Sequence, residues 1–239
     1  MSWLFSPNIN VIHGFSTCLG GISTGHFASL NLGGQEDDPL VIQQNRSIAL
    51  TQLSIDPKCI ANLRQVHGNQ VVIGKPGAQT GDALVSAEKG IALTISVADC
   101  YPILFQDPKN QVIGAAHAGW RGTLSLIVTK TIEEMVKLGA HPQFIQVAIG
   151  QGISHKKFEV GQEVIEQFRD AGFPETCFTG MHLNLLEANK FLLIKNGIKP
   201  ENIWAMNRCT FEPDFYSYRR DKGKTGRMWA VIMNEMATL

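Results

Sequence analysis

Apolar residues recur along the chain at two different spacings. From Trp120 to Leu138 they return at helical intervals, and Gly139 follows as a residue that commonly ends helices. Two mainly apolar runs, at 91–97 and 144–150, have the length of buried strands. We therefore expect helices and strands to interleave along the chain.

Turn and capping residues locate further elements. The pair Asp38-Pro39 combines an N-cap with proline at the first helical position, and predicts a helix to about Leu53. A DPKN turn separates the apolar runs 102–106 and 111–117 and predicts a hairpin. The same reasoning gives strands at 60–66, 70–74, 204–210 and 228–233, and helices around 160–168 and over 183–195.

Interleaved helices and strands together with hairpins define the expected fold class. They predict an α/β (mixed α+β) layered sandwich, in which a mixed sheet with hairpins carries packed helices. The segment 14–34 is rich in glycine and serine and is expected to be an ordered loop or one that a ligand orders. No repeat or linker-like stretch interrupts the sequence, so we expect a single domain over residues 1–239.

Composition narrows the class of protein. Lys+Arg and Asp+Glu are 21 each, and this zero net charge argues against a general attraction to nucleic acid or to an anionic membrane. The N-terminus has no signal-peptide pattern, and no apolar stretch is long enough to span a membrane. The five cysteines are scattered and odd in number, which favours reduced thiols in the cytoplasm.

Three reactive side chains fall at the ends of predicted strands. His67 lies in a tight turn, Cys100 follows the run ISVAD, and His117 ends the second hairpin strand. Strand ends converge at a sheet edge, and three His or Cys ligands on zinc leave a fourth position for water or substrate. The alternative is a small buried thiol with two satisfied histidines, because the spacings match no recognised zinc motif.

A second candidate feature is the segment AGWRG. Gly119 and Gly122 allow the backbone to approach a ligand, and a helix N-terminus with Arg121 beside it suits phosphate or another anion. The alternative is an ordinary helix start with Trp120 in the core. The basic segment 218–227 is either a solvated loop or a mobile, substrate-facing cover.

Other motifs are weaker. GISTG at 21–25 matches the GxSxG nucleophile elbow, but it sits in a long polar loop rather than between a strand and a helix. GKT at 223–225 lacks the upstream glycine of a phosphate-binding P-loop, because Tyr218 stands there. Neither motif supports a function.

Several longer motifs together resemble one family. TCLGGISTGHFASLNLGG, RQVHG, ADCYPILFQD, AAHAGWRG and YRRDKGKTGRM follow its order nearly end to end. The chain resembles the bacterial laccase-domain proteins, also called the YfiH-type polyphenol oxidase family. The resemblance implies a sandwich fold similar to that of deamidases with a Cys/His site, such as cytotoxic necrotizing factor.

The resemblance also implies an activity. Family members are described as enzymes that cleave adenosine, inosine and S-methyl-5′-thioadenosine with phosphate, giving the free base and (methylthio)ribose 1-phosphate, and that also deaminate adenosine. The expected partners are therefore purine nucleosides and phosphate, with no nucleic acid and no membrane. The expected assembly is a monomer or a homodimer.

Site residues carry over from the family by position. His67, Cys100 and His117 are the implied ligands of zinc, with copper as the older assignment, and are also the implied catalytic residues. The implied phosphate- or substrate-binding residues are Asn31, Arg46, Arg121 and Arg220.

Two acids are candidates to orient a ligand or to move a proton. They are Asp99, which is counted among the catalytic residues, and Asp82. The sequence does not rank them.

Alternatives from other classes stay open. One is a metal-free Cys/His hydrolase, an amidase or deamidase, with Cys100 as nucleophile and His117 as base. A copper-dependent polyphenol oxidase is another, although a laccase needs several copper centres and more histidines than the seven present. A third is a non-catalytic nucleotide-binding module.

The chain also departs from the family pattern. The family usually has Pro, Tyr, Asp and His at four positions, where this chain has Gln151, Phe158, Asn184 and Tyr218. The implied metal ligands are intact, so we expect these changes to affect substrate preference.

Overall fold

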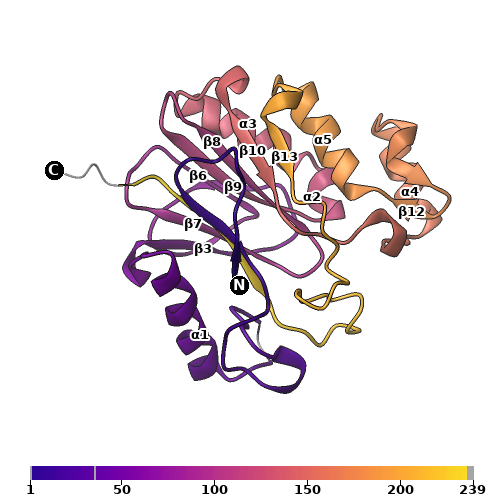
Figure 1. Ribbon diagram of the computed structural model, residues 1–239. Helices are drawn as coiled ribbons and strands as arrows, with labels where there is room; N and C mark the ends of the chain where they lie inside the picture. The colour runs from indigo at the N-terminus through magenta and orange to yellow at the C-terminus, as the bar shows by residue number, and fades with distance from the viewer. Residues whose placement is uncertain (1, 35, 236–239) are drawn as a thin grey trace.

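Two mixed β-sheets stack face to face in the computed structural model, which describes residues 2–34 and 36–235. One helix covers the outer face of the first sheet, and several cover the outer face of the second (Figure 1). The expected layered α/β fold is confirmed. The expected single domain over 1–239 stays a prediction, and its range includes residues outside those described.

The first sheet has the order β1-β2-β14-β7-β3-β5. Its strands are β1 (Trp3–Leu4), β2 (Ile12–Ser16), β14 (Met228–Met233), β7 (Ala92–Val97), β3 (Ile60–Arg64) and β5 (Gly77–Thr80). Strand β14 runs antiparallel to β2 and β7, whereas β3 runs parallel to β7 and β5. The first and last segments of the chain therefore pair at the centre of one sheet.

The second sheet has the order β13-β10-β8-β9-β6-β4. Its strands are β13 (Ile203–Ala205), β10 (Gln146–Ile149), β8 (Tyr101–Asp107), β9 (Val112–Ala118), β6 (Ala83–Ser86) and β4 (Val71–Ile73). Strands β8 and β9 form the expected antiparallel hairpin, with Tyr101 opposite Ala118 and Asp107 opposite Val112. A separate pair, β11 (Phe178–Thr179) and β12 (His182–Leu183), stands outside both sheets.

Strand alternation divides the core into layers. On β14, Met228, Ala230 and Ile232 pack between the sheets, while the intervening residues pack toward α1 (Pro39–Gln52). The predicted start of α1 is confirmed, since the Asp38 side chain accepts a hydrogen bond from the Leu40 amide.

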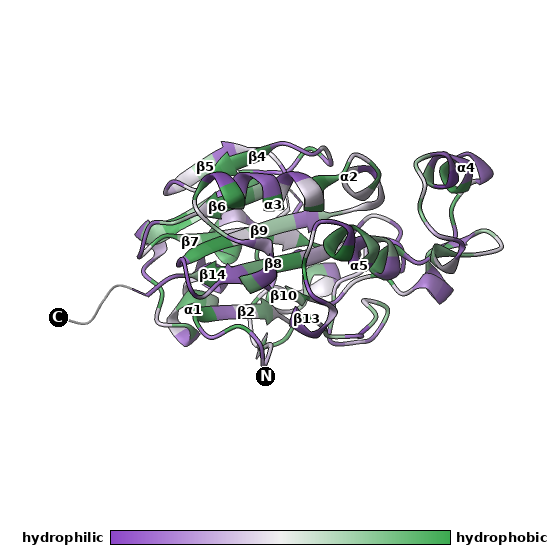
Figure 2. Cartoon of the chain, turned by 90° about the horizontal axis from the view of Figure 1, so that it is seen from above, coloured by the Kyte–Doolittle hydropathy of each residue, from purple (hydrophilic) through white to green (hydrophobic). Residues whose placement is uncertain are grey.

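The remaining helices pack on or beyond the second sheet. They are α2 (Trp120–Leu124), α3 (Ile127–Lys137), α4 (Gln162–Asp170) and α5 (Leu185–Lys195). Short 3-10 turns occur at Gly25–Phe27, Pro57–Cys59, Pro142–Phe144, His155–Lys157, Glu175–Cys177 and Pro200–Asn202. Figure 2 shows α4 standing away from the body of the molecule at one end. None of the helices among the described residues is long and apolar enough to cross a membrane.

Two expectations about elements are wrong in detail. The helix expected from Trp120 to Leu138 divides into α2 and α3, because Leu126 adopts a left-handed backbone with φ 68°. The strand expected at 204–210 is only the short β13. The strands expected on either side of the turn at 67–69 are present as β3 and β4, and since they belong to different sheets, this turn carries the chain from one sheet to the other.

Candidate active site

His67, Cys100 and His117 meet at one end of the two sheets. His117 lies on the face of β9 that also carries Ile113 and Ala115, which pack between the sheets. Cys100 directly precedes β8, and His67 lies in the turn after β3. One ligand atom from each residue lies within 4.8 Å of the others, and the two imidazole centroids are 4.8 Å apart. The structure therefore brings together the three residues that the sequence singled out.

Asp82 organises this cluster from a fully buried position. Its Oδ1 accepts hydrogen bonds from His117 Nδ1 at 3.0 Å and from the His67 amide at 2.9 Å. Its Oδ2 accepts from the amides of Gly68 at 2.7 Å and Val66 at 3.3 Å. One carboxylate thus orients an imidazole and fixes the turn that carries the other histidine.

Asp99 has a different role. Its carboxylate accepts from the Thr210 hydroxyl at 2.5 Å and from the Arg219 amide at 2.7 Å. Its backbone is left-handed, with φ 85°, as is that of His67, with φ 60°. Such strained conformations concentrate at functional sites. Asp99 therefore fastens the C-terminal loop beside Cys100, whereas Asp82 is the acid that contacts an imidazole.

Protonation of the thiol and the imidazole is coupled. Burial alone would raise the pKa of Cys100, but the charges and hydrogen bonds of His117 and His67 lower it. Burial alone would lower the pKa of His117, but the Cys100 charge and the bond to Asp82 raise it. Burial is likewise opposed at Asp82, where hydrogen bonds from His117 and the turn amides lower the pKa. The arrangement therefore favours a thiolate, the form that binds metals and attacks electrophiles.

The donor set fits a single metal ion. Two imidazoles and a thiolate are ligands that zinc prefers, and three of them leave one coordination position open. Asp82 supplies the carboxylate that commonly orients a ligating histidine. Among residues 2–34 and 36–235, this is the one cluster of at least three His, Cys, Asp or Glu side chains with such spacing.

Two partly buried arginines have no carboxylate at ion-pair distance in the described part of the chain. Arg46 donates from Nε to the Leu32 carbonyl at 2.9 Å, and its guanidinium stacks over Trp229. Arg227 donates to the carbonyls of Thr225 and Gly226. Burial lowers the pKa of both arginines, and for Arg227 the opposing charges are those of Tyr218, Cys100, Asp99 and Glu36. In the described part of the chain, neither guanidinium lies within 4.0 Å of a carboxylate oxygen.

The segment around Gly33 joins these two arginines. A β-carbon built on Gly33 would lie 3.5 Å from the Arg227 side chain and 3.8 Å from an Arg46 terminal nitrogen. Asn31 is fully buried and accepts from the amides of Gly33 and Arg227, so it positions this segment rather than facing a cavity. Arg227 stood out in the sequence only as one cation of the basic segment 218–227.

The other two predicted anion-binding arginines have different surroundings. Arg220 is held by the Asp221 carboxylate and by the carbonyls of Thr210, Glu212 and Phe215. Arg121 is exposed and stacks on the Trp120 ring at 4.2 Å. It starts a helix of only five residues, whose dipole is correspondingly small. Their roles in phosphate binding stay predictions.

Ser23 of the GISTG motif is an internal part of its loop. Its hydroxyl donates to Asp37 at 2.7 Å and accepts from the Asn45 amide group at 2.9 Å. The buried serine therefore has a structural explanation, in agreement with the weak weight given to the motif.

The departures from the family pattern fall in recognisable places. Asn184 caps α5 by accepting from the Glu187 amide, a task that an aspartate performs equally well. Gln151 is buried and donates to the Ser16 carbonyl, but its Oε1 has no hydrogen-bond partner among the described residues. Phe158 lines a pocket near the centre, and Tyr218 lies against Arg227.

Comparison with known sequences identifies relatives along nearly the whole chain. A family model described as multi-copper polyphenol oxidoreductase laccase matches residues 12–235. A purine nucleoside phosphorylase from Deinococcus radiodurans is 48% identical over 233 residues, covering 96% of this chain and 91% of the relative. Adenosine deaminase RL5, from an unknown prokaryotic organism, is 31% identical over 251 residues, covering 95% of this chain and 96% of the relative.

A solved structure has the same fold. The crystal structure of YlmD from Geobacillus stearothermophilus matches with a TM-score of 0.92 and 32% sequence identity. The match covers 99% of this chain and 97% of that protein. Sequence and fold therefore point to the same group of relatives.

Proposed function

The chain belongs to the multi-copper polyphenol oxidoreductase laccase family, and we propose that it is a zinc-dependent purine nucleoside enzyme. The proposed reactions are phosphorolysis of adenosine, inosine and S-methyl-5′-thioadenosine, and deamination of adenosine. Relatives named purine nucleoside phosphorylase and adenosine deaminase support both. Zinc is supported by the His, Cys, His donor set, to which copper is the alternative.

The observation that carries the phosphorylase activity is the pair Arg46 and Arg227. Both side chains are partly buried, neither has a carboxylate oxygen within 4.0 Å among the described residues, and Gly33 lies beside a terminal nitrogen of Arg46 and the Cβ and Cγ of Arg227. Such a pair is suited to bind a multiply charged anion. Partial burial strengthens their attraction to that anion because less water screens it. Phosphate is the anion that this function requires.

The residues divide the work of phosphorolysis. Arg46 and Arg227 hold phosphate so that one oxygen bonds to the ribose anomeric carbon while the carbon–nitrogen bond to the base breaks. The base leaves with that electron pair and takes up a proton. Zinc, when bound by His67, Cys100 and His117, supplies a Lewis acid. Asp82 keeps the His117 ring oriented, and Asp99 keeps the C-terminal loop beside the site.

A second candidate function has its own support. Asp82, His117 and Cys100 stand in the order of a carboxylate–imidazole–thiol triad, in which Cys100 is the nucleophile and His117 the base. This metal-free hydrolase would act on an amide through a covalent intermediate. It leaves the third side chain of the cluster, His67, without a role, so we rank it below the metal enzyme.

The cellular setting is proposed on the same basis. All five cysteines are free, which suits a reducing cytoplasm. The expected partners are nucleosides and phosphate rather than nucleic acid or membrane. Whether the enzyme is a monomer or a homodimer stays a prediction.

Product analysis tests the phosphorylase. Inosine incubated with the protein and phosphate is expected to give hypoxanthine and ribose 1-phosphate, and to give no base without phosphate. Arg227→Gln and Arg46→Gln are expected to raise the KM for phosphate about tenfold or more each, since each removes one charge-assisted contact. Arg169→Gln is the control, because Arg169 is an exposed arginine of α4 that pairs with Glu175. Base release that is equally fast without phosphate would refute phosphorolysis.

A further inference from the structure

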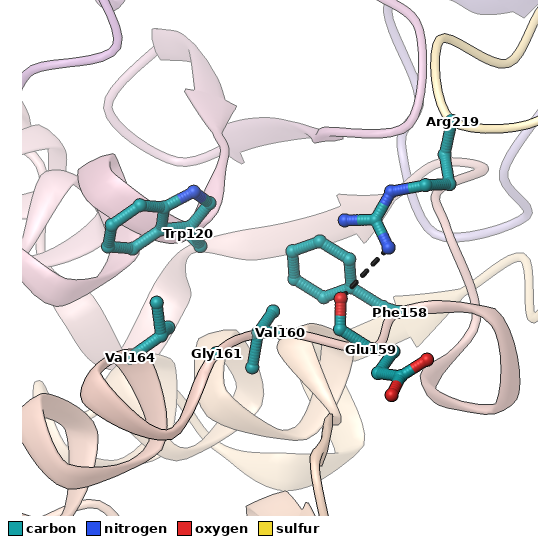
Figure 3. Close-up of a pocket in the computed structure, with 7 residues that line it drawn as sticks. All are labelled: Trp120, Phe158, Glu159, Val160, Gly161, Val164 and Arg219. Atoms are coloured by element: carbon teal, nitrogen blue, oxygen red, sulfur yellow. Dashed lines mark hydrogen bonds between the residues drawn. The ribbon is translucent and has the colours of Figure 1, made fainter. Parts of the chain in front are cut away.

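A pocket of about 460 Å³ opens between the start of α2 and the segment that leads into α4 (Figure 3). Trp120 and Arg219 lie on opposite sides of it, Phe158 and Val160 lie between them, and Val164 lies below Trp120 in this view. The pocket has the size of a small-molecule site and contributes no residue to the reactions described above.

Both sides of the pocket are tied to the neighbourhood of Cys100. Trp120 follows Gly119, where a β-carbon would lie only 2.8 Å from the Cys100 sulfur. On the other side, the amide of Arg219 donates to the Asp99 carboxylate at 2.7 Å, and Asp99 directly precedes Cys100. A ligand in the pocket therefore lies beside the candidate metal centre.

The lining combines the aromatic rings of Trp120 and Phe158 with one cation, Arg219, and one acid, Glu159. The Arg219 guanidinium lies 5.3 Å from the Phe158 ring centroid, and Arg121, which is not part of the lining, lies over Trp120. Arg219 donates from one nitrogen to the Glu159 carbonyl at 2.9 Å, as the dashed line in Figure 3 shows. Within residues 2–34 and 36–235, no carboxylate pairs with either arginine at 4.0 Å or less.

This chemistry suits a flat heteroaromatic ring. Indole and phenyl faces stack on such rings, and arginine adds both a cation–π contact and directed N–H groups. Phosphate would gain nothing from the indole and the valines, and a bare sugar would leave the aromatic faces unused.

We propose that this pocket binds the purine base of the nucleoside, with the base against the Trp120 indole and Arg219 donating to its edge. The inference rests on the nucleoside function proposed above. A guanidinium only donates hydrogen bonds. O6 and N7 of hypoxanthine are both acceptors, whereas adenine presents an amino group in place of O6. Arg219 therefore favours inosine over adenosine, while Trp120 serves both.

Kinetics on both nucleosides test the two residues separately. Trp120→Ala is expected to raise the KM for inosine and for adenosine about tenfold, within the range of one lost stacking contact. Trp120→Phe keeps an aromatic face and should restore most of the affinity, and the KM for phosphate should not change in either variant. Arg219→Met is expected to lower the inosine-to-adenosine ratio of kcat/KM about fivefold or more.

A control and a binding measurement separate the possible failures. Phe144→Ala removes a ring that lies under the Lys109 ammonium away from this pocket, and it should change none of these constants. Hypoxanthine binding to the purified protein is measured by calorimetry. Binding that depends on Trp120 in a protein without phosphorylase or adenosine deaminase activity would uphold the pocket and refute the proposed function. Normal phosphorolysis with unchanged nucleoside KM and hypoxanthine affinity in Trp120→Ala and Arg219→Met would overturn the pocket alone.

Discussion

The β8–β9 hairpin has a buried carboxylate at each end, and the two ends differ in one respect. Asp107, at the turn, accepts from the amides of Lys109, Asn110 and His141 and from the Asn110 side chain. Asp82, at the other end, accepts from three turn amides in the same way, but also from His117. Burial opposes ionisation of both acids, and hydrogen bonds lower the pKa of each.

Two buried histidines repeat the contrast. His117 faces a thiolate and a carboxylate, and its pKa is raised in spite of burial. His13, on β2 near the turn end, has the Val11 carbonyl and the Ser6 amide as hydrogen-bond partners and the edge-on Phe5 ring as a neighbour, and burial lowers its pKa. A buried carboxylate or a buried histidine that stands alone therefore has a structural role, in a turn or on a strand. The end of the hairpin where a carboxylate, a histidine and a thiol meet is the candidate functional end.

The largest expected effect comes from removing the thiol. Cys100→Ser should lose the bound metal and reduce activity more than about 1000-fold, because one of three metal ligands is weakened. Elemental analysis and product assays measure the two losses together, with Cys59→Ser as the control. Full zinc in the variant would contradict the metal assignment. A covalent adduct on Cys100 during turnover would support the hydrolase instead.

The second largest effect is expected from Asp82→Asn. Loss of the charge and of one acceptor leaves the His117 ring less well oriented, and losing the carboxylate that holds a ligating histidine lowers metal affinity or activity about 10–100-fold. Zinc titration and kcat/KM, measured well below the unfolding temperature, report the effect. Unchanged values would mean that Asp82 serves the turn only, as Asp107 does.

How far the sequence predicted this end of the molecule depends on the distance between partners along the chain. His67, Cys100 and His117 were predicted because each adjoins an apolar run that becomes a strand. The bond that ranks Asp82 above Asp99 joins residues 35 positions apart, and no local pattern encodes it. Arg227 depends in the same way on its position beside Gly33. The strands at 228–233 and around 91–97 were predicted well because their runs are mainly apolar and have the length of a strand.

Local exceptions explain most of the remaining errors. Strand β2 (Ile12–Ser16) was missed because it runs into the glycine- and serine-rich segment, and its partner β14 comes from the opposite end of the described chain. The break between α2 and α3 needs a leucine in the left-handed region, which intrinsic preferences disfavour. Ser125 directly follows α2, and its hydroxyl donates a hydrogen bond to the Arg121 carbonyl of that helix at 2.7 Å.

Asp107→Asn tests the structural end. An asparagine keeps one acceptor oxygen but turns an NH₂ group toward amide donors, so we expect a loss of about 1–3 kcal/mol in the free energy of unfolding. Urea denaturation measures this loss. Zinc content and kcat/KM of the folded variant should equal those of the unsubstituted protein. A loss of zinc comparable to that of Asp82→Asn would remove the distinction between the two ends.

The smallest effect is expected at His13. Because burial lowers its pKa below the ordinary value of 6.5, the folded protein keeps this ring neutral while the unfolded chain takes up a proton. The stability that the neutral ring contributes is therefore present above about pH 6.5 and is lost as the pH falls below it.

His13→Gln keeps an acceptor for the Ser6 amide but cannot titrate. Between pH 7 and 5, its free energy of unfolding should fall less steeply, by at most about 1.4 kcal/mol per pH unit, the limit for one proton. Unfolding curves at several pH values measure the slope. Identical slopes in the two proteins would mean that His13 has the same pKa when folded and unfolded. The opposite pKa shifts of His13 and His117 would then no longer distinguish the two ends of the hairpin.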